Sequence, residues 1–483
     1  MPRAGASSEK ADAMTSSTSA DASGTTKPLN SRGKVIFASL IGTTIEFYDF
    51  YIYATAAVLV FPALFFPNQT SANQLLSSFA VFGVAFVARP LGSIVFGHFG
   101  DKIGRKATLV ASLLTMGIAT FLIGLLPAAT TEGWVFLAPL LLVVLRFLQG
   151  LALGGEWSGA ALLATENAPA GKRAIYGTFP QLGAPIGFIL ANLLFVLLST
   201  TLSPEDFLSW GWRVPFLLSA VMVIIGLYVR LKLIESASFQ KVQNEGKVVK
   251  IPLGTTFRRH WRALLLGTFI MFATYVLFYF MTAFTLTYGT APSSVEQAQA
   301  RAEAAGGEFT AAQAAAFVPG LGMARTDFLW MLIIGVVFFG IFTIVSGPLA
   351  ERFGRRKMLL ATTVGIAVFG LLWAPLFGAG TVGAMVLLIV GFTLMGLTFG
   401  PMAAVLPELF PANVRYTGSA VAYNVSSMIG AAPASFIAVA LWQAAGGSTV
   451  LVGAYLSVAA VATFIALFVS RETRDHDYEN NVG

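Results

Sequence analysis

Long apolar stretches recur along almost the whole chain of 483 residues, separated by short polar segments. A helix that crosses the ~30 Å hydrocarbon core of a bilayer needs about 20 mostly apolar residues. By this criterion the sequence predicts an all-α polytopic membrane protein with twelve transmembrane helices. They are expected to begin near Val35, Leu75, Ala107, Trp134, Ala174, Val214, Ala263, Phe328, Met358, Val382, Ser419 and Val450.

The composition supports this prediction and excludes other classes of protein. Hydrophobic residues make up 56% of the chain and charged residues only 11%, with a mean hydropathy of +0.76. Soluble domains carry roughly 25% charged residues, so this chain cannot coat a soluble fold of its size with polar groups. The same figures exclude a disordered protein, and the absence of cysteine excludes a scaffold of disulfides or thiolate-bound metal.

Lysine and arginine cluster in alternate loops, which predicts how the helices are oriented. Basic residues accumulate on the cytoplasmic side of membrane proteins. In this chain the clustered bases are Lys102, Arg105, Lys106, Lys172, Arg173, the eight from Arg230 to Arg262, Arg352, Arg355, Arg356, Lys357, Arg415, Arg471 and Arg474. We therefore expect a bacterial cytoplasmic (inner) membrane protein with both termini in the cytoplasm. The net charge of +7 reflects this topology, so no nucleic-acid partner is expected.

Two motifs occur twice, once in each half of the chain. GHFGDKIGRK at 97–106 has a counterpart in GPLAERFGRRK at 347–357. The pattern E-x-x-P-x-x-x-R at 166–173 returns at 408–415. Such parallel repeats are typical of proteins in which two similar bundles face each other across a site at the bilayer midplane. The sequence therefore predicts two pseudo-symmetric six-helix bundles.

The predicted spans and the polar segments around them divide the chain into five parts. They are a disordered cytoplasmic tail at 1–32, an N-terminal bundle at 33–232, a cytoplasmic linker at 233–260, a C-terminal bundle at 261–470 and a cytoplasmic tail at 471–483. The C-terminal bundle contains a long extracytoplasmic loop at 290–324, which is rich in Ala and Glu and has room for a short amphipathic helix.

The duplicated loop motif predicts a network of charges beside helix ends. Gly97 allows close approach of backbones, Gly104 makes a tight turn, and Asp101 can pair with the bases that follow. A single copy is equally explained as a signal for topology, whereas two copies at matching positions favour a gate. The predicted network comprises Gly97, Asp101, Lys102, Gly104, Arg105, Lys106, Glu156, Glu166, Glu351, Arg355, Glu408 and Arg415, in which Glu166 is expected to pair with the Arg105 cluster.

With these motifs the sequence resembles the major facilitator superfamily. Within it, GTTIEFYDF at 42–50, VARPLG at 87–92, RFLQG at 146–150, GGE at 154–156 and WGWRVPF at 210–216 are similar to the metabolite:proton symporter family. That family includes shikimate, α-ketoglutarate, citrate and proline/betaine porters, and residues 165–192 look closest to the shikimate-like branch. Ala237 stands where relatives often carry proline, in the linker. The resemblance implies proton-driven uptake of a small carboxylated or zwitterionic metabolite.

Five ionisable residues fall inside predicted transmembrane helices, where charges are expensive and mark functional sites. They are Glu46, Asp49, Arg89, Arg146 and Glu156. Glu46 and Asp49 share one helical face near the midplane, where one carboxyl can bind and release a proton. We expect Asp49, supported by Glu46, to couple to protons; the alternative is a static ion pair with Arg89 or Arg146. Glu156 lies nearer the cytoplasmic side and suits a gating or packing network.

Arg89 and Arg146 lie at a similar predicted depth. A guanidinium binds a carboxylate through two parallel hydrogen bonds, so both residues are candidates for a substrate clamp. The alternative is that they hold helices together as buried ion pairs. Tyr275, Tyr279 and Thr282 form one stripe on the seventh helix, which suits a hydroxylated or cyclic ligand or simple packing. The other candidate substrate contacts are Tyr53, Gln149, Gln181, Tyr423 and Asn424.

Other functions lack support in the sequence. A primary pump or membrane enzyme is disfavoured because there is no phosphate-binding glycine loop and no metal-ligand spacing, the only histidines being His98, His260 and His476. We expect no cofactor besides a proton gradient, and a protein that works as a monomer with protons, lipid and a small organic acid or zwitterion as partners. Proton-coupled efflux and uncoupled facilitation remain alternatives. Shikimate, dicarboxylates and betaines are not separable at this level.

Overall fold

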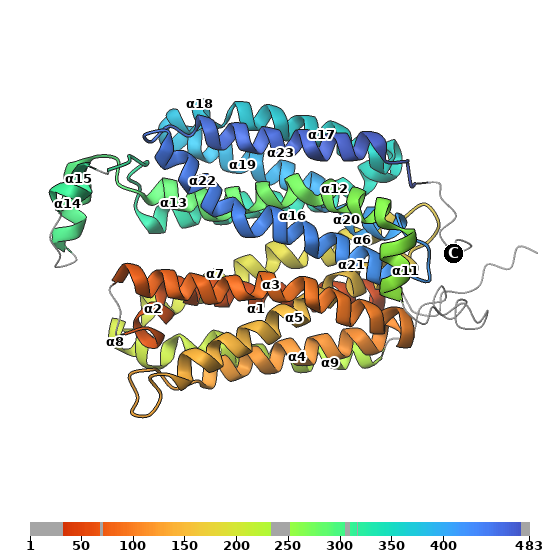
Figure 1. Cartoon of the computed structure of the whole chain (residues 1–483), viewed down its shortest axis with the longest axis horizontal. Helices are drawn as coiled ribbons and strands as arrows, with labels where there is room; N and C mark the ends of the chain where they lie inside the picture. The colour runs from red at the N-terminus through yellow and green to blue at the C-terminus, as the bar shows by residue number, and fades with distance from the viewer. Residues whose placement is uncertain (1–31, 68–70, 233–251, 305–309, 316, 475–483) are drawn as a thin grey trace, which may run out of the picture.

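The computed structural model describes residues 32–67, 71–232, 252–304, 310–315 and 317–474. Across these residues the chain forms helices and no strand, which confirms the predicted all-α fold. Long helices run side by side along one axis in two layers, one from each half of the chain (Figure 1). Residues 1–31 of the predicted N-terminal tail, residues 475–483 of the predicted C-terminal tail and most of the predicted linker lie outside the described residues.

The N-terminal layer contains six membrane-crossing segments. They are α1 (Arg32–Leu59), α3 (Ser71–Ile103), α4 (Arg105–Leu125), α5 (Leu137–Glu166), α6 (Arg173–Gln181) continued by α7 (Gly183–Thr201), and α9 (Arg213–Leu231). The short α2 (Phe61–Phe65), α8 (Pro204–Asp206) and π-helical turn η1 (Phe207–Gly211) complete this half.

The C-terminal layer repeats this plan with more interruptions. Its segments are α12 (Trp261–Tyr279) with η2 (Phe280–Phe284) and α13 (Thr285–Thr290), α16 (Arg325–Phe353), α17 (Arg355–Leu371) with α18 (Trp373–Gly378), α19 (Gly380–Phe399) with α20 (Met402–Glu408), α21 (Arg415–Ser426) with η3 (Ser427–Ala431) and α22 (Ala432–Ala444), and α23 (Val450–Val469). Three further helices lie between the spans along the chain. α11 (Pro252–Arg259) precedes α12, and α14 (Val295–Ala304) and α15 (Ala311–Ala315) lie in the predicted outer loop.

Among the described residues, eleven segments are long and apolar enough to cross a membrane. The twelfth expected span corresponds to α17, which at 17 residues is shorter than the others and is continued by α18 after Leu372. Together they agree with the predicted count of twelve. The chain is thus a membrane protein of two six-helix halves.

Glycines allow both tight turns and close contacts between helices in this fold. Gly104 and Gly354 have φ of +111° and +91°, a backbone conformation that favours glycine, and each turns the chain between two consecutive spans. Inside the N-terminal half, a Cβ on Gly154 would lie 2.2 Å from the carbonyl oxygen of Arg89. Gly150 and Gly154, four residues apart on α5, thus allow the close approach of α5 to α3.

Several spans are irregular at mid-length. The α6–α7 segment breaks at Leu182 between Pro180 and Pro185, and η3 leads into Pro433 at the start of α22. Proline in a transmembrane helix frees backbone carbonyls that neighbouring helices can satisfy.

Candidate functional site

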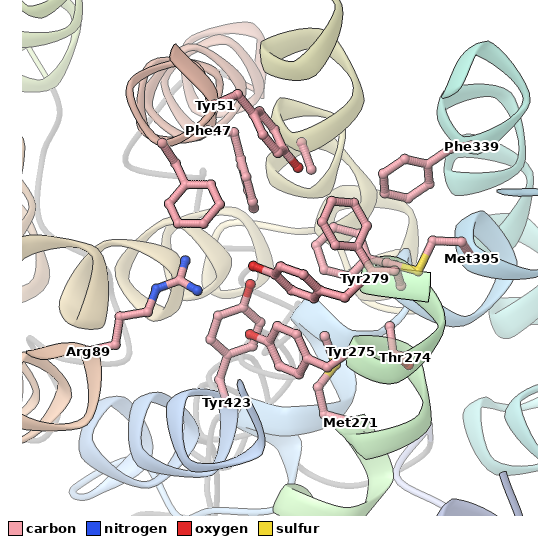
Figure 2. Close-up of a pocket in the computed structure, with 14 residues that line it drawn as sticks. Phe47, Tyr51, Arg89, Met271, Thr274, Tyr275, Tyr279, Phe339, Met395 and Tyr423 are labelled. Carbon is pink, nitrogen blue, oxygen red and sulfur yellow. The ribbon is translucent and has the colours of Figure 1, made fainter. Parts of the chain in front are cut away.

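A pocket of about 410 Å³ of empty space lies between the two halves (Figure 2). It is lined by Phe47, Phe50, Tyr51, Arg89, Ala184, Met271, Thr274, Tyr275, Phe278, Tyr279, Phe339, Met395, Phe399 and Tyr423. These residues come from α1, α3 and α7 on one side and from α12, α16, α19 and α21 on the other. The lining is aromatic and apolar apart from a few polar groups, which is the usual make-up of a small-molecule site.

Arg89 is the charged residue of this lining. Its side chain is buried, and Nη1 donates a hydrogen bond of 3.2 Å to Oγ of Ser427 in the opposite half. Its guanidinium lies 5.2 Å from the ring centre of Phe50, close enough for a cation–π contact. Figure 2 shows the guanidinium directed toward the hydroxyls of Tyr275, Tyr279 and Tyr423. A cation and a group of hydroxyls therefore converge from the two halves.

Two hydroxyls of the lining have no partner among the described residues. They belong to Tyr51 and Tyr275, and both atoms are buried. A buried polar group without a hydrogen bond costs roughly 1–3 kcal/mol, so such groups are well suited to receive a ligand. Thr282, the third member of the predicted stripe, instead bonds the carbonyl of Phe278 and is not part of the lining.

Arg146 lies outside the pocket lining, within the N-terminal half. Its guanidinium carbon is 3.9 Å from the ring centre of Tyr53 and 4.8 Å from that of Phe82. Nη1 donates to Oε1 of Gln149 at 3.0 Å. The structure thus places three predicted substrate contacts, Arg146, Gln149 and Tyr53, in one cluster behind the pocket.

That cluster reaches Asp49. Gln149 donates to Oγ1 of Thr120 at 2.7 Å, and Thr120 donates to Oδ2 of Asp49 at 2.9 Å. A chain of hydrogen bonds therefore connects Arg146 with Asp49 without a direct ion pair. Glu46, one turn earlier on α1, is fully buried, and neither of its carboxyl oxygens has a partner among the described residues.

Glu156 forms an ion pair with Arg230 of α9 deep in the N-terminal half. Ser112 also donates to Oε2 of Glu156 at 2.5 Å, and Arg230 donates to the carbonyl of Leu109 at 2.6 Å. This arrangement agrees with a packing network for Glu156. Sequence reasoning missed the partner, because Arg230 was counted among the loop bases although its side chain is 2% exposed. Its place at the end of an apolar run, one turn short of the linker, was the available signal.

Stacked aromatic rings lie beside the pocket. Trp157 of α5 and Tyr423 of α21 stack across the two halves, with ring centres 3.8 Å apart. Trp157 donates to Oε1 of Gln181 at 2.7 Å, and Gln181 donates to the carbonyl of Phe399 at 2.6 Å. Asn424 donates to the carbonyl of Gly154 at 2.8 Å. Of these residues Tyr423 and Phe399 line the pocket, whereas the predicted contacts Gln181 and Asn424 join the halves beside it.

The two halves also join at one end of the bundle, here called the basic end, where α3 and α16 finish and α6 and α21 begin. Asp101 accepts hydrogen bonds from the backbone N–H groups of Tyr416 (3.2 Å) and Thr417 (2.8 Å) at the start of α21. Glu351, its counterpart in the repeat, accepts one of 2.6 Å from the N–H of Ala174 at the start of α6. An acidic side chain is favourable at a helix N-terminus. The duplicated motif therefore closes the basic end twice, once from each half.

Further charges complete the basic end. Arg355 pairs with Glu351 at 2.8 Å and with Glu408 at 3.3 Å, and Arg415 pairs with Glu166 at 3.5 Å across the halves. Glu166 thus pairs with Arg415. Its predicted pairing with the Arg105 cluster stays a prediction, because the side chain of Arg105 lies outside the described residues.

Three other members of the predicted network, Lys102, Lys106 and Gly97, have different settings. Lys106 donates to the carbonyl of Leu231 at 2.8 Å, and Lys102 is exposed. A Cβ on Gly97 would lie 3.0 Å from Cα of Thr417, so Gly97 permits the approach of α3 to α21.

The segment after α23 contributes as well. Glu472 accepts the N–H groups of Arg355 and Arg356 at 2.9 and 3.0 Å, and Thr473 donates to Glu408 at 2.5 Å. The predicted tail therefore begins as part of the basic end.

Comparison with known proteins decides the family. A family model described as "Sugar (and other) transporter" matches residues 34–250 and 314–480. The chain belongs to this family of major facilitator transporters. The predicted resemblance and the assignment as a transporter rather than an enzyme are confirmed.

The transporter is similar over nearly its full length to named bacterial relatives. It is 56% identical to the inner membrane metabolite transport protein YhjE of Escherichia coli, over 92% of this chain and 96% of the relative. It is 35% identical to the shikimate transporter of Escherichia coli (93% and 97%) and 32% identical to the proline/betaine transporter of Salmonella typhimurium (91% and 83%). The transporter therefore moves small metabolites across a membrane.

Solved structures show the same fold. The proton:xylose symporter XylE bound to a bromodeoxyglucose superposes with a TM-score of 0.69 at 16% identity, covering 93% of this chain and 98% of that chain. A double tryptophan variant of XylE gives 0.72 with the same identity and coverage. The predicted major facilitator fold is confirmed.

Proposed function

We propose that the transporter takes up a small carboxylated or zwitterionic metabolite, of the shikimate or dicarboxylate kind, together with protons. The observation that carries this proposal is the convergence of Arg89 and the tyrosine hydroxyls in one pocket between the halves. A buried guanidinium without an acidic partner among the described residues is suited to a carboxylate, because its charge is then balanced by the ligand.

The remainder of the pocket suits a compact ligand with hydroxyl groups. Aromatic side chains cover the faces of a small ring, while Tyr51 and Tyr275 offer unpartnered hydroxyls. The names of the relatives, a shikimate transporter and a proline/betaine transporter among them, support an acid or a zwitterion.

Proton coupling rests on the carboxyls of α1. Glu46 and Asp49 are both buried next to the pocket wall formed by Phe47 and Phe50. Buried carboxyls with few hydrogen-bond donors are suited to bind a proton, since the neutral form costs less in a low-dielectric setting. Arg146, through Gln149 and Thr120, is suited to orient Asp49. A symporter needs such a group close to its substrate.

Reconstituted vesicles test the proposal. Purified protein in proteoliposomes with an alkaline lumen is given radiolabelled shikimate, and accumulation above the external concentration is expected until a protonophore is added. Equilibration without accumulation would indicate a facilitator. Accumulation only with an acidic lumen would indicate an antiporter that serves efflux. Competition by unlabelled dicarboxylates and betaine then ranks the substrate classes.

A further inference from the structure

Glu46 differs from the other buried acids of the N-terminal half. Its side chain is 0% exposed and neither carboxyl oxygen accepts a hydrogen bond from any described residue. Asp49 accepts one from Thr120, Asp101 accepts two from backbone N–H groups, and Glu156 is held by Ser112 and Arg230. A carboxylate ion in such a position would be buried without compensation, which is costly. The site accommodates the neutral acid.

Charged and titratable groups face Glu46 from each side. Arg89 of α3, Glu156 of α5 and Arg230 of α9 act on it electrostatically, as does Tyr423 of α21. On α1 itself the titratable neighbours are Asp49 and Tyr51. Glu46 therefore lies between the arginine of the pocket and the ion pair of the N-terminal half.

The two arginines are not equally available to Glu46. Arg230 is already neutralised by Glu156 and donates to the carbonyl of Leu109. It also approaches α1 closely, since a Cβ on Gly42 would lie 2.0 Å from its Nη2. Arg89, in contrast, bonds the neutral hydroxyl of Ser427 and has an unpartnered Nε. The cation without an acidic partner is thus the one that faces the ligand.

We propose that Glu46 is the carboxyl whose protonation is coupled to substrate binding, because Glu46 and the substrate carboxylate compete for Arg89. This inference rests on the proposed function. With Glu46 protonated, the positive charge of Arg89 is free for the substrate anion. When the proton leaves to the cytoplasm, the new Glu46 carboxylate pairs with Arg89 and displaces the substrate. One proton is taken up at Glu46 for each carboxylate bound, and both are released together.

This competition assigns different roles to the two acids of α1. Asp49 keeps its hydrogen bond from Thr120 and its link through Gln149 to Arg146. It is thus a positioning residue, whereas Glu46 exchanges the proton. The sequence analysis favours Asp49. Both carboxyls share one helical face, and the hydrogen-bond partners that distinguish them are known only from the structure. The competition predicts that proton and substrate bind with positive linkage.

The first experiment needs no ligand. Infrared spectra of the full-length protein in lipid at neutral pH are expected to contain the carbonyl stretch of a protonated buried acid. This band should be absent in Glu46→Gln and present in the matched variant Asp49→Asn. A thermal melt of each variant checks that it is folded. A band that persists in Glu46→Gln and vanishes in Asp49→Asn would overturn the inference.

The second experiment measures linkage, with shikimate as the probe. In the parent protein the Kd is expected to rise about tenfold per pH unit once Glu46 deprotonates. In Glu46→Gln binding should vary less than about twofold over the same range, and an alkaline lumen should no longer drive accumulation. In Asp49→Asn the Kd should still rise with pH, whatever the transport rate of that variant. Accumulation that survives in Glu46→Gln would overturn the inference while leaving the proposed function intact. A parent protein that never accumulates shikimate would instead contradict the proposed function, and the infrared band still decides the protonation of Glu46.

Discussion

The two halves of the transporter share one architecture but differ in where they bury charge. In the N-terminal half, four ionisable side chains are buried at mid-length of the spans, namely Glu46, Asp49, Arg89 and Arg146. In the C-terminal half, the buried charged residues that the structure describes are Arg355, Glu408 and Arg415, which belong to the basic end. The C-terminal half instead presents tyrosine, methionine and phenylalanine to the pocket. The helical scaffold is therefore present in both halves, whereas the charges buried at mid-length of the spans lie in the N-terminal half.

The same comparison holds for the contacts that close the basic end. Asp101 bonds two backbone N–H groups at the start of α21, while Glu351 bonds one at the start of α6 and is shared with Arg355. Both copies of the repeat therefore place an acid at a helix N-terminus, but the contact made by Asp101 has more hydrogen bonds than the contact made by Glu351.

The largest effect is expected on stability, at the ion pair of the N-terminal half. Arg230→Met leaves the buried Glu156 with the hydroxyl of Ser112 as its partner, and losing one member of a buried pair costs about 3–5 kcal/mol. We expect a large drop in Tm measured in detergent. The double variant Glu156→Gln with Arg230→Met should recover part of it, because no buried charge remains.

Arg355→Met is the matched change in the C-terminal half. Its acids keep other donors, since Glu408 is bonded by Thr473 and Glu351 by the N–H of Ala174. The loss of Tm should therefore be smaller than for Arg230→Met. Equal losses would contradict the view that only the N-terminal half depends on charges buried at depth.

The next effect concerns transport. Arg89→Lys keeps the charge but loses the planar fork that matches a carboxylate, and losing a partner of a buried charged contact costs about 2 kcal/mol or more. We expect shikimate uptake into proteoliposomes to fall by about 30-fold or more. Arg213→Lys is the control, because Arg213 lies in the same half but bonds the carbonyls of Gly124 and Leu126, away from the pocket. Similar losses for both variants would show that Arg89 acts only through the fold.

The sequence predicts much of this architecture because bilayer physics leaves few options. Apolar length predicts the spans, and the duplicated motif at 97–106 and 347–357 predicts two halves with acids at matching turns. Charge in an apolar helix also indicates Arg89, Glu46 and Asp49, all of which the structure places in or beside the pocket. These inferences depend only on local sequence and helical periodicity.

The division between pocket and interior is not visible at that level. Tyr53 shares a stripe with Glu46 and Asp49, yet this stripe faces the N-terminal half, whereas Phe47, Phe50 and Tyr51 face the pocket. Which face of α1 looks across to the other half depends on how α1 packs against α5, α7 and α9. For the same reason Arg146 could not be separated from Arg89 by depth alone.

A smaller effect is expected at the basic end, where Asp101→Asn weakens charge-assisted bonds worth about 1.5–3 kcal/mol to the N-terminus of α21. The population with this end open should rise about tenfold. The chain has no cysteine, so a single Ala403→Cys, at a buried position of α20 beside Gly177 of α6, reports opening through its rate of maleimide labelling. Glu351→Gln keeps an acceptor for Ala174 and should accelerate labelling less; a faster rate than in Asp101→Asn would reverse the ranking of the two contacts.

The smallest effect is expected from single hydroxyls on the C-terminal wall of the pocket. Tyr275→Phe removes a buried hydroxyl that forms no hydrogen bond of normal geometry in the described protein and has the hydroxyl of Tyr423 as its neighbour. The lost affinity is therefore expected to come mainly from the ligand, and one neutral hydrogen bond is worth about 0.5–1.5 kcal/mol. The Kd for shikimate should rise between about twofold and tenfold, with Tm unchanged or slightly higher. Isothermal titration at acidic pH measures this without interference from Glu46. A change as large as that of Arg89→Lys would mean that the C-terminal half also supplies a principal anchor, and the contrast between a charged half and an aromatic half would no longer describe the site.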